Sequence, residues 1–178
     1  MTTKTLKPHH VEDLRSSGLS EATIDKTGFY SGTVEEVRRI VGFDVGPGLV
    51  IPYPGISYWR VKPDRPPVID GKRAKYLTPK GGQVRLYIPP EVRPLLKDTT
   101  ARLLITEGEK KALKATQEGF PAIGLSGFWC FRQDHKPIAD LDLISWEGRP
   151  VYLAYDSDLA EKDDVLQAEW AFSQELEG

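Results

Sequence analysis

The sequence predicts an α/β fold: a parallel sheet with flanking helices in residues 101–178, preceded by a small α+β subdomain with an antiparallel sheet in residues 1–100. In the last 78 residues, apolar strand patterns alternate with helical patterns, which is typical of parallel strands joined by right-handed crossovers. Residues 48–90 instead hold short segments rich in Val, Ile and Tyr. Pro and Gly separate these segments, which favours antiparallel strands.

Three short helices are predicted before the first sheet. Residues 8–16 form the first helix, and Ser20 and Gly28 have the residue types that begin and end the second. Thr33 and Glu36 have the spacing of a capping box at the start of the third. The third helix also presents one apolar face, which consists of Val34, Val37, Ile40 and Val41. We expect these helices to pack together without a chemical role.

Four strands are predicted in the antiparallel sheet of residues 48–90: GLVIPYPG, SYWRVKP, AKYLTPK and VRLYIPP. Residues 64–71 are interpreted as a hairpin loop, and residues 94–100 as a linker. The second domain then has the strands ARLLITEG, PAIGLSG and PVYLAYD. Its predicted helices are KKALKATQEGF, IADLDLISWEG and DDVLQAEWAFSQEL.

The composition describes a soluble globular protein, with 39% hydrophobic and 28% charged residues. No apolar run approaches the ~18 residues that cross a bilayer, and the N-terminus lacks the apolar core of a signal peptide. A single cysteine, Cys130, excludes an internal disulfide bond. We therefore expect a cytoplasmic protein with no membrane partner.

The net charge of −2 conceals two halves of opposite sign. Residues 1–100 carry 16 Lys and Arg against 11 Asp and Glu, whereas residues 101–178 carry 8 against 15. This difference predicts a polyanionic ligand for the first half and a cation for the second.

Acidic side chains follow two of the predicted parallel strands at the point where each strand ends. Glu107 ends the first, and Asp156 and Asp158 end the third, 49 residues later. Ligands gather at the carboxyl ends of the strands in such sheets, and carboxylate oxygens suit Mg²⁺ or Mn²⁺. These three residues are therefore candidate metal ligands. The alternative is a group of solvated loop acids, since 15 acids in 78 residues also cluster by chance.

The segments LLITEGEKKALKATQEGFPAIGLSG and PVYLAYDSDLA resemble the Toprim domain shared by bacterial-type primases, topoisomerases and related nucleases. The resemblance implies a Toprim-like parallel sheet, an acid/base or metal-binding role for Glu107, and Mg²⁺ binding by Asp156 and Asp158. The motif EGEKKAL closely resembles the corresponding segment of the Toprim-like domain at the front of plasmid and phage primase-helicase proteins. Upstream, the four strand segments of residues 48–90 resemble the basic subdomain that precedes Toprim in replicative primases.

Two features depart from the family pattern. Ser157 stands where many primases have glycine between the two aspartates, and the sequence ends one helix after Asp158, where relatives continue with a strand and more acids. We therefore expect a truncated Toprim domain that synthesises little primer by itself. The apolar side chains of the last helix, Trp170 and Phe172 among them, are expected to mark a missing neighbour or to pack on the N-terminal helices.

A basic, aromatic segment lies between residues 58 and 85, with eight Lys and Arg against two Asp. Cations that track phosphates and aromatic rings that stack on bases are typical of single-stranded nucleic-acid binding. The alternative is a half-buried sheet that its lysines keep soluble. The predicted nucleic-acid-binding residues are Arg60, Lys62, Lys72, Arg73, Lys75, Tyr76, Lys80 and Arg85.

Lys110 and Lys111 begin the helix after Glu107, where they are candidates for phosphate binding, although a solvated helix face is the alternative. His9, His10 and His135 show no metal-ligand spacing among themselves, and we expect all three at the surface.

These features together predict a primase-like catalytic core from a phage, plasmid or other mobile-element replication protein, catalysing Mg²⁺-dependent, template-directed nucleotidyl transfer. Its expected partners are a single-stranded DNA template, nucleotides and a helicase domain or protein. A Toprim-type nuclease and a non-catalytic module that binds single-stranded nucleic acid are the alternatives.

Overall fold

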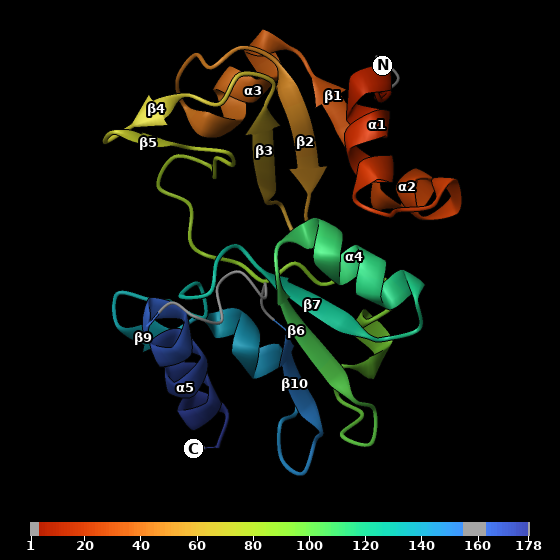
Figure 1. The fold of residues 1–178 in the computed structure, drawn as a ribbon, viewed down its shortest axis with the longest axis vertical. Helices are drawn as coiled ribbons and strands as arrows, with labels where there is room; N and C mark the ends of the chain where they lie inside the picture. Colours follow the sequence, from red (N-terminus) through yellow and green to blue (C-terminus); the bar gives the residue numbers. More distant parts are fainter. Residues whose placement is uncertain (1–3, 155–162, 178) are drawn as a thin grey trace. The chain divides into compact units, whose positions relative to one another are not determined.

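The computed structural model describes residues 4–154 and 163–177, and the chain divides into two compact units, Met1–Gly82 and Gln83–Gly178 (Figure 1). Residues 83–100 therefore belong to the second unit. The elements of the first unit are α1 (Pro8–Ser16), α2 (Glu21–Thr27), β1 (Tyr30–Gly32), α3 (Val34–Val41), β2 (Gly48–Pro52), β3 (Trp59–Pro63), β4 (Val68–Ile69) and β5 (Lys72–Arg73).

The three predicted helices of the first unit are confirmed, together with their caps. The Ser20 side chain accepts a hydrogen bond from the Thr23 N–H at the start of α2. At the start of α3, Thr33 and Glu36 each accept a hydrogen bond from the other's backbone N–H, which completes the capping box. These caps satisfy helix N–H groups that have no partner within their own helix.

An antiparallel sheet of order β1-β2-β3 forms the centre of the first unit, and α3 packs against it. The core between them consists of Tyr30, Val37, Val41, Val50, Val61 and Leu77. Gly48 lies where a Cβ would approach the Lys62 carbonyl oxygen to 2.6 Å, so only glycine fits this close approach of β2 to β3.

The predicted third and fourth strands of this sheet are wrong. Residues 74–80 contribute a single bridge, from Leu77 to Val61. In residues 84–90, Tyr87 pairs with Gly124 of the second unit, so this segment does not extend the antiparallel sheet. Pro79, Pro89 and Pro90 interrupt these segments, and a proline has no N–H to donate to a ladder.

The second unit contains the predicted parallel sheet, with strand order β10-β6-β7. Its elements are η1 (Arg93–Leu95), β6 (Leu103–Glu107), α4 (Glu109–Gln117), β7 (Ala122–Leu125), β8 (Arg132–Gln133), β9 (Lys136–Pro137), η2 (Ala139–Leu143), β10 (Val151–Ala154) and α5 (Asp163–Glu177). The α/β fold class with a parallel sheet, flanking helices and a small antiparallel sheet before it is confirmed.

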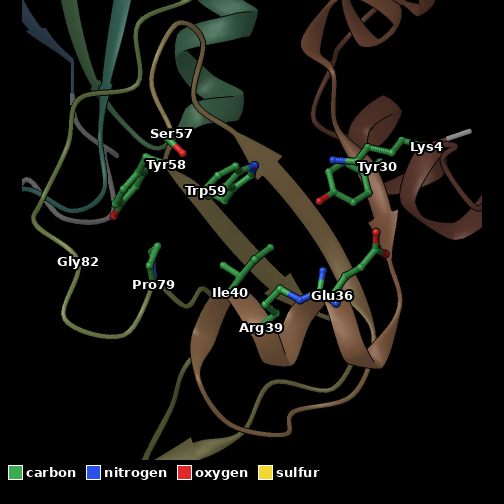
Figure 2. A pocket seen from close by; sticks show the side chains of 10 residues that line it. All are labelled: Lys4, Tyr30, Glu36, Arg39, Ile40, Ser57, Tyr58, Trp59, Pro79 and Gly82. Atoms are coloured by element: carbon green, nitrogen blue, oxygen red, sulfur yellow. The ribbon is translucent and has the colours of Figure 1, made fainter. Parts of the chain in front are cut away.

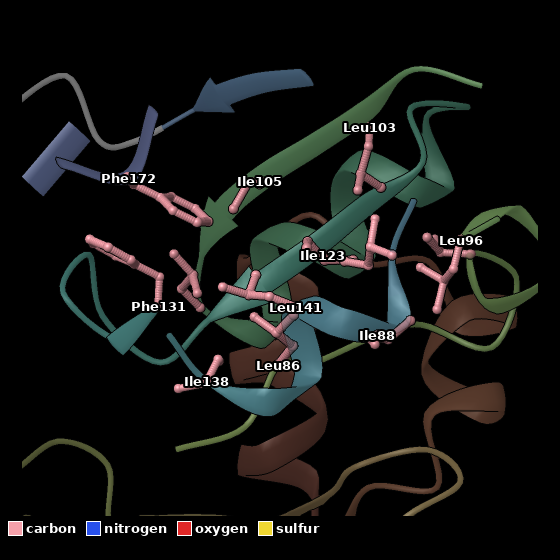
Figure 3. Close-up of a cluster of buried hydrophobic side chains, with 13 residues drawn as sticks. Leu86, Ile88, Leu96, Leu103, Ile105, Ile123, Phe131, Ile138, Leu141 and Phe172 are labelled. Atoms are coloured by element: carbon pink, nitrogen blue, oxygen red, sulfur yellow. The ribbon is translucent and has the colours of Figure 1, made fainter. Parts of the chain in front are cut away.

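Layers of side chains cover the two faces of the parallel sheet. Ala112 and Leu113 of α4 are buried, and α4 packs on β6 and β7. The other layer is a larger apolar cluster that joins strand residues such as Ile105 and Ile123 to η2 and α5 (Figure 3). In this cluster Phe172 stacks on Phe131, with 4.4 Å between ring centroids.

Two expectations for the end of the chain need correction. The predicted helix over residues 138–148 is only the short 3₁₀ helix η2, because Ile144 is extended and the Ser145 N–H, which would continue a helix, donates to the Leu96 carbonyl oxygen instead. Among the apolar residues of α5, Phe172 is fully buried within the second unit, so the expectation that it packs on the N-terminal helices is wrong. Trp170 and Leu166 are 68% and 49% exposed, and a missing neighbour for them stays a prediction. The stacking on Phe131 explains why Phe172 does not contribute to an exposed patch.

The predicted linker at residues 94–100 is a packed segment that Arg149 holds in place. The buried Arg149 guanidinium donates hydrogen bonds to the carbonyl oxygens of Leu95, Leu96 and Ala101, and to that of Ser145. Burial lowers the pKa of Arg149 from its usual value. None of the described helices is both long enough and apolar enough to cross a membrane.

Candidate functional site

The carboxyl end of β6, the central strand of the parallel sheet, is where the predicted acidic site begins. Glu107 is the last residue of β6 and is half-buried. Gly108 follows with φ of 89° and precedes α4, and its N–H donates to the Leu125 carbonyl oxygen of β7. Side chains other than glycine rarely adopt this φ, so the sharp turn from strand to helix depends on Gly108.

A close approach of the backbone keeps this turn in position. A Cβ at Gly124 of β7 would lie 2.7 Å from the Gly108 carbonyl oxygen. At Gly108 itself, a Cβ would meet no described atom within 4 Å, so it is the backbone conformation and not crowding that favours glycine here. The Glu107 carboxylate is a hard oxygen donor, and its chemistry fits a divalent cation such as Mg²⁺.

The neighbouring strand β10 ends at Ala154, whose Cα partner is Thr106. Thr106 precedes Glu107, and its buried hydroxyl has no hydrogen-bond partner among the described residues. Asp156 and Asp158 follow Ala154 in the sequence but lie outside the described residues. Their predicted role in metal binding therefore stays a prediction, as does that of Glu107.

Glu109 is a second acid of this turn, to which the sequence analysis assigned no role. It is the first residue of α4 and is only 2% exposed. Its position suits a negative charge, because the N-terminal end of a helix carries a partial positive charge. Burial, together with the charges of Glu109 and Glu91, raises the pKa of the Tyr87 hydroxyl, so that this hydroxyl stays neutral. The strand-end E-G-E pattern was the signal for Glu109, but only the fold shows its burial.

The two lysines predicted to bind phosphate lie in the first turn of α4. Lys110 is half-buried and Lys111 is exposed. Both follow Glu107 by three and four residues, and the structure places them at the start of the helix that succeeds this acid. Phosphate binding by these lysines stays a prediction.

The predicted nucleic-acid-binding residues are distributed over several environments. Arg60 is buried, and its guanidinium carbon lies 4.8 Å from the centre of the Tyr76 ring. Lys62 forms an ion pair of 2.5 Å with Asp13 of α1. Four exposed cations follow β4: Lys72, Arg73, Lys75 and Lys80.

Arg85 differs from the other predicted nucleic-acid-binding residues because it belongs to the second unit. Its guanidinium forms a bidentate ion pair with Asp140, at 2.9 and 3.0 Å from Nε and 2.7 Å from Nη2. Asp140 also accepts a hydrogen bond from the Leu86 N–H. This pair ties the start of the second unit to η2.

The first unit contains a pocket of about 580 Å³ that combines aromatic and charged side chains (Figure 2). Trp59 of β3 and Tyr30 of β1 come from the sheet, and the Lys4 ammonium lies 4.0 Å from the centre of the Tyr30 ring. Sequence reasoning missed this pocket because its residues come from distant segments. Its lining is Lys4, Tyr30, Glu36, Arg39, Ile40, Ser57, Tyr58, Trp59, Pro79 and Gly82.

The three histidines were all expected at the surface, and for His10 this expectation is wrong. His10 is only 5% exposed, whereas His9 and His135 are exposed. Ser31 and Asp64 both form hydrogen bonds with the His10 ring, and these bonds explain why a polar ring is buried.

Comparisons with known proteins find one family model that matches part of the chain and solved structures that resemble most of it. The family described as a domain of unknown function (DUF3854) matches residues 93–177. No curated protein matches the sequence.

Three solved structures illustrate the likeness. The crystal structure of the Aquifex aeolicus primase, with its zinc-binding and RNA polymerase domains, has a TM-score of 0.59 at 14% identity; the match covers 93% of this chain and 46% of that one. The DnaG catalytic core has a TM-score of 0.61 at 16% identity, and the match covers 92% of this chain and 58% of that one. The DnaG primase catalytic domain bound to ssDNA has a TM-score of 0.57 at 15% identity, and the match covers 93% of this chain and 58% of that one. This chain thus spans about half the length of the structures that it matches.

Proposed function

From the premise that this chain has the Toprim-type fold of a bacterial primase catalytic core, we propose that it performs template-directed nucleotidyl transfer with a divalent cation, Mg²⁺ or Mn²⁺. The setting we propose is a replication protein of a phage, plasmid or other mobile element, which works with a helicase domain or protein. The observation that carries the proposal is the place of Glu107, at the carboxyl end of the central parallel strand.

In this proposal Glu107, Asp156 and Asp158 hold the cation. Support comes from the register of the sheet, because Ala154 pairs with Thr106 and Asp156 is only two residues further along the chain. A bound cation would neutralise and orient the phosphate oxygens of the incoming nucleotide. Lys110 or Lys111 would contact a phosphate from the first turn of α4.

The template would bind to the first unit through its exposed cations and its aromatic pocket. The exposed residues Lys72, Arg73, Lys75 and Lys80 supply charge for the backbone, while the partly exposed Trp59 supplies a ring face for a base. The solved DnaG domain bound to ssDNA, which has this fold, supports a single strand as the ligand.

One assay separates this function from its two alternatives. The protein, in its native reading frame, is mixed with an end-labelled single-stranded template, a second label on the nucleotides, and Mg²⁺ or Mn²⁺. We expect label from the nucleotides to enter new products while the template keeps its length. Template shortening without incorporation would identify a nuclease, and binding without either reaction would identify a non-catalytic module.

A second prediction concerns the exposed cations after β4. Replacing Lys72, Arg73 and Lys75 together with alanine removes up to three phosphate contacts, so we expect single-stranded DNA to bind about 10- to 100-fold more weakly. The slope of log affinity against log salt concentration should fall by about 2, since each phosphate contact on a single strand contributes about 0.7. Fluorescence anisotropy at several salt concentrations measures both quantities.

The matched control replaces three other exposed cations, Lys26, Lys97 and Arg102, with alanine. The net charge changes equally, so a general electrostatic effect would weaken binding in both triple variants. If the two variants bind DNA with the same affinity and salt slope, the segment after β4 is not the binding surface.

A further inference from the structure

Outside the acidic turn, the described residues contain one cluster of His and Asp side chains that could hold a metal ion: His9, His10 and Asp64. His9 and His10 lie in α1, and Asp64 directly follows β3, so two segments about 54 residues apart in the sequence meet here. The candidate ligand atoms of the three residues all lie within 4.8 Å of one another.

The distances bring both histidines onto the same carboxylate. His10 Nε2 lies 2.8 Å from Asp64 Oδ1, and His9 Nε2 lies 3.4 Å from Asp64 Oδ2. In a tetrahedral site with ligands ~2.0–2.1 Å from zinc, neighbouring ligand atoms lie about 3.3 Å apart. The three atoms therefore need shifts of only about 1–2 Å to surround one ion.

The three candidate ligand side chains differ in how far they are buried, and therefore in how freely they can adjust to an ion. The His10 side chain is 6% exposed, while those of Asp64 and His9 are 25% and 55% exposed. His10 thus provides a fixed ligand, and the two more exposed side chains adjust around it. Solvent reaches the cluster from the side of His9, which gives an ion a path of entry.

Ser31 of β1 supplies the outer support that a metal-binding histidine usually has. Its hydroxyl lies 2.7 Å from His10 Nδ1 and also accepts a hydrogen bond from the Lys7 N–H. A hydroxyl oxygen has two acceptor lone pairs, so Ser31 can accept from both groups at once. Because the Asp64 carboxylate can only accept, His10 Nε2 carries the proton of their hydrogen bond in the metal-free protein. A bound metal would replace this proton, and the Ser31 hydroxyl could then accept from the proton on Nδ1.

We propose that His9, His10 and Asp64 form a binding site for a transition-metal ion, with Zn²⁺ as the best match, and that water fills the fourth position. Two imidazoles and one carboxylate suit zinc, whereas Mg²⁺ prefers oxygen ligands alone. The ion would tie α1 to the end of β3, and the site is separate from the acidic turn at Glu107. This inference does not depend on the proposed nucleotidyl transfer.

The test is Zn²⁺ binding by the untagged full chain, measured by competition with a chromogenic chelator in the presence of millimolar Mg²⁺. We expect one Zn²⁺ per chain, and the visible spectrum of a four-coordinate site when Co²⁺ replaces it. At a free Zn²⁺ concentration of 100 times the dissociation constant, the melting temperature should rise by about 5–10 °C.

Two variants should weaken Zn²⁺ binding by at least about 10-fold: Asp64→Asn, which keeps the shape of the side chain, and His9→Gln, whose exposed site tolerates substitution. The matched controls are Asp70→Asn and His135→Gln, which make the same chemical changes at exposed positions outside the cluster. Glu107→Gln should also bind Zn²⁺ like the wild type. Stoichiometric binding that neither Asp64→Asn nor His9→Gln weakens, or no binding by the wild type, would overturn the proposal and leave a purely structural His–Asp hydrogen bond.

Discussion

Replacing Glu107 with glutamine is expected to lower template-directed synthesis at least about 100-fold while the protein stays folded. Glutamine keeps the shape of the side chain but removes the negative charge that would help to hold the cation on the phosphates. Loss of one such charge at a reacting centre commonly costs two or more powers of ten in rate. The measurement is the initial rate of nucleotide incorporation by the protein in its native reading frame, with saturating template, at several Mn²⁺ concentrations.

The same site is tested without catalysis by the double variant Asp156→Asn, Asp158→Asn. If the two aspartates share one ion with Glu107, calorimetric titration should show Mn²⁺ binding in the wild type and none in the double variant. Removing carboxylates that repel one another also leaves the metal-free protein at least as stable as before. Equal Mn²⁺ affinity in the two proteins would refute the site.

Glu147→Gln is the matched control for these variants, because it makes the same chemical change at an exposed position of the second unit. It should leave both incorporation and Mn²⁺ binding unchanged. A similar loss of activity in Glu147→Gln would mean that overall charge, and not the turn after β6, controls the reaction.

Replacing Arg149 with alanine is expected to destabilise the protein by about 3 kcal/mol. The guanidinium donates to four carbonyl oxygens, and hydrogen bonds that involve a charged group each contribute about 1.5–3 kcal/mol. Burial of the positive charge costs several kcal/mol and offsets part of this sum, so the net loss is about 3 kcal/mol. The melting temperature should fall by about 6–12 °C for a protein of this size. Denaturant unfolding, followed by circular dichroism, gives the free energy of unfolding directly.

Two further variants show whether the geometry of the guanidinium matters. Arg149→Lys keeps the positive charge but loses the planar fork that reaches several carbonyls, so we expect most of the destabilisation to persist. Arg102→Ala removes an exposed arginine of the same unit and should change stability by no more than about 0.5 kcal/mol. If Arg149→Ala unfolds at the same midpoint denaturant concentration as the wild type, the carbonyl oxygens find equally good partners without the Arg149 side chain.

Signals that act within one element were sufficient for much of the fold. The capping box of Thr33 and Glu36 joins residues three apart, so its spacing predicts the start of α3 without further context. The parallel sheet was predictable because continuous apolar strands alternate with a helical period. Glu107 was identified for the same reason, as the acid that ends such a strand.

Pairing between distant segments was decided only by the tertiary structure. Residues 84–90 have the composition of a strand, but composition does not determine which strand they pair with. In the structure Tyr87 pairs with Gly124 and not with the upstream sheet. His10 looks like a surface residue in sequence until Ser31 and Asp64, 21 and 54 residues away, satisfy its ring. Arg149 likewise binds carbonyls up to 54 residues away. Whether a polar side chain is buried depends on partners that only packing brings near, because burial without them costs several kcal/mol and local sequence does not encode their approach.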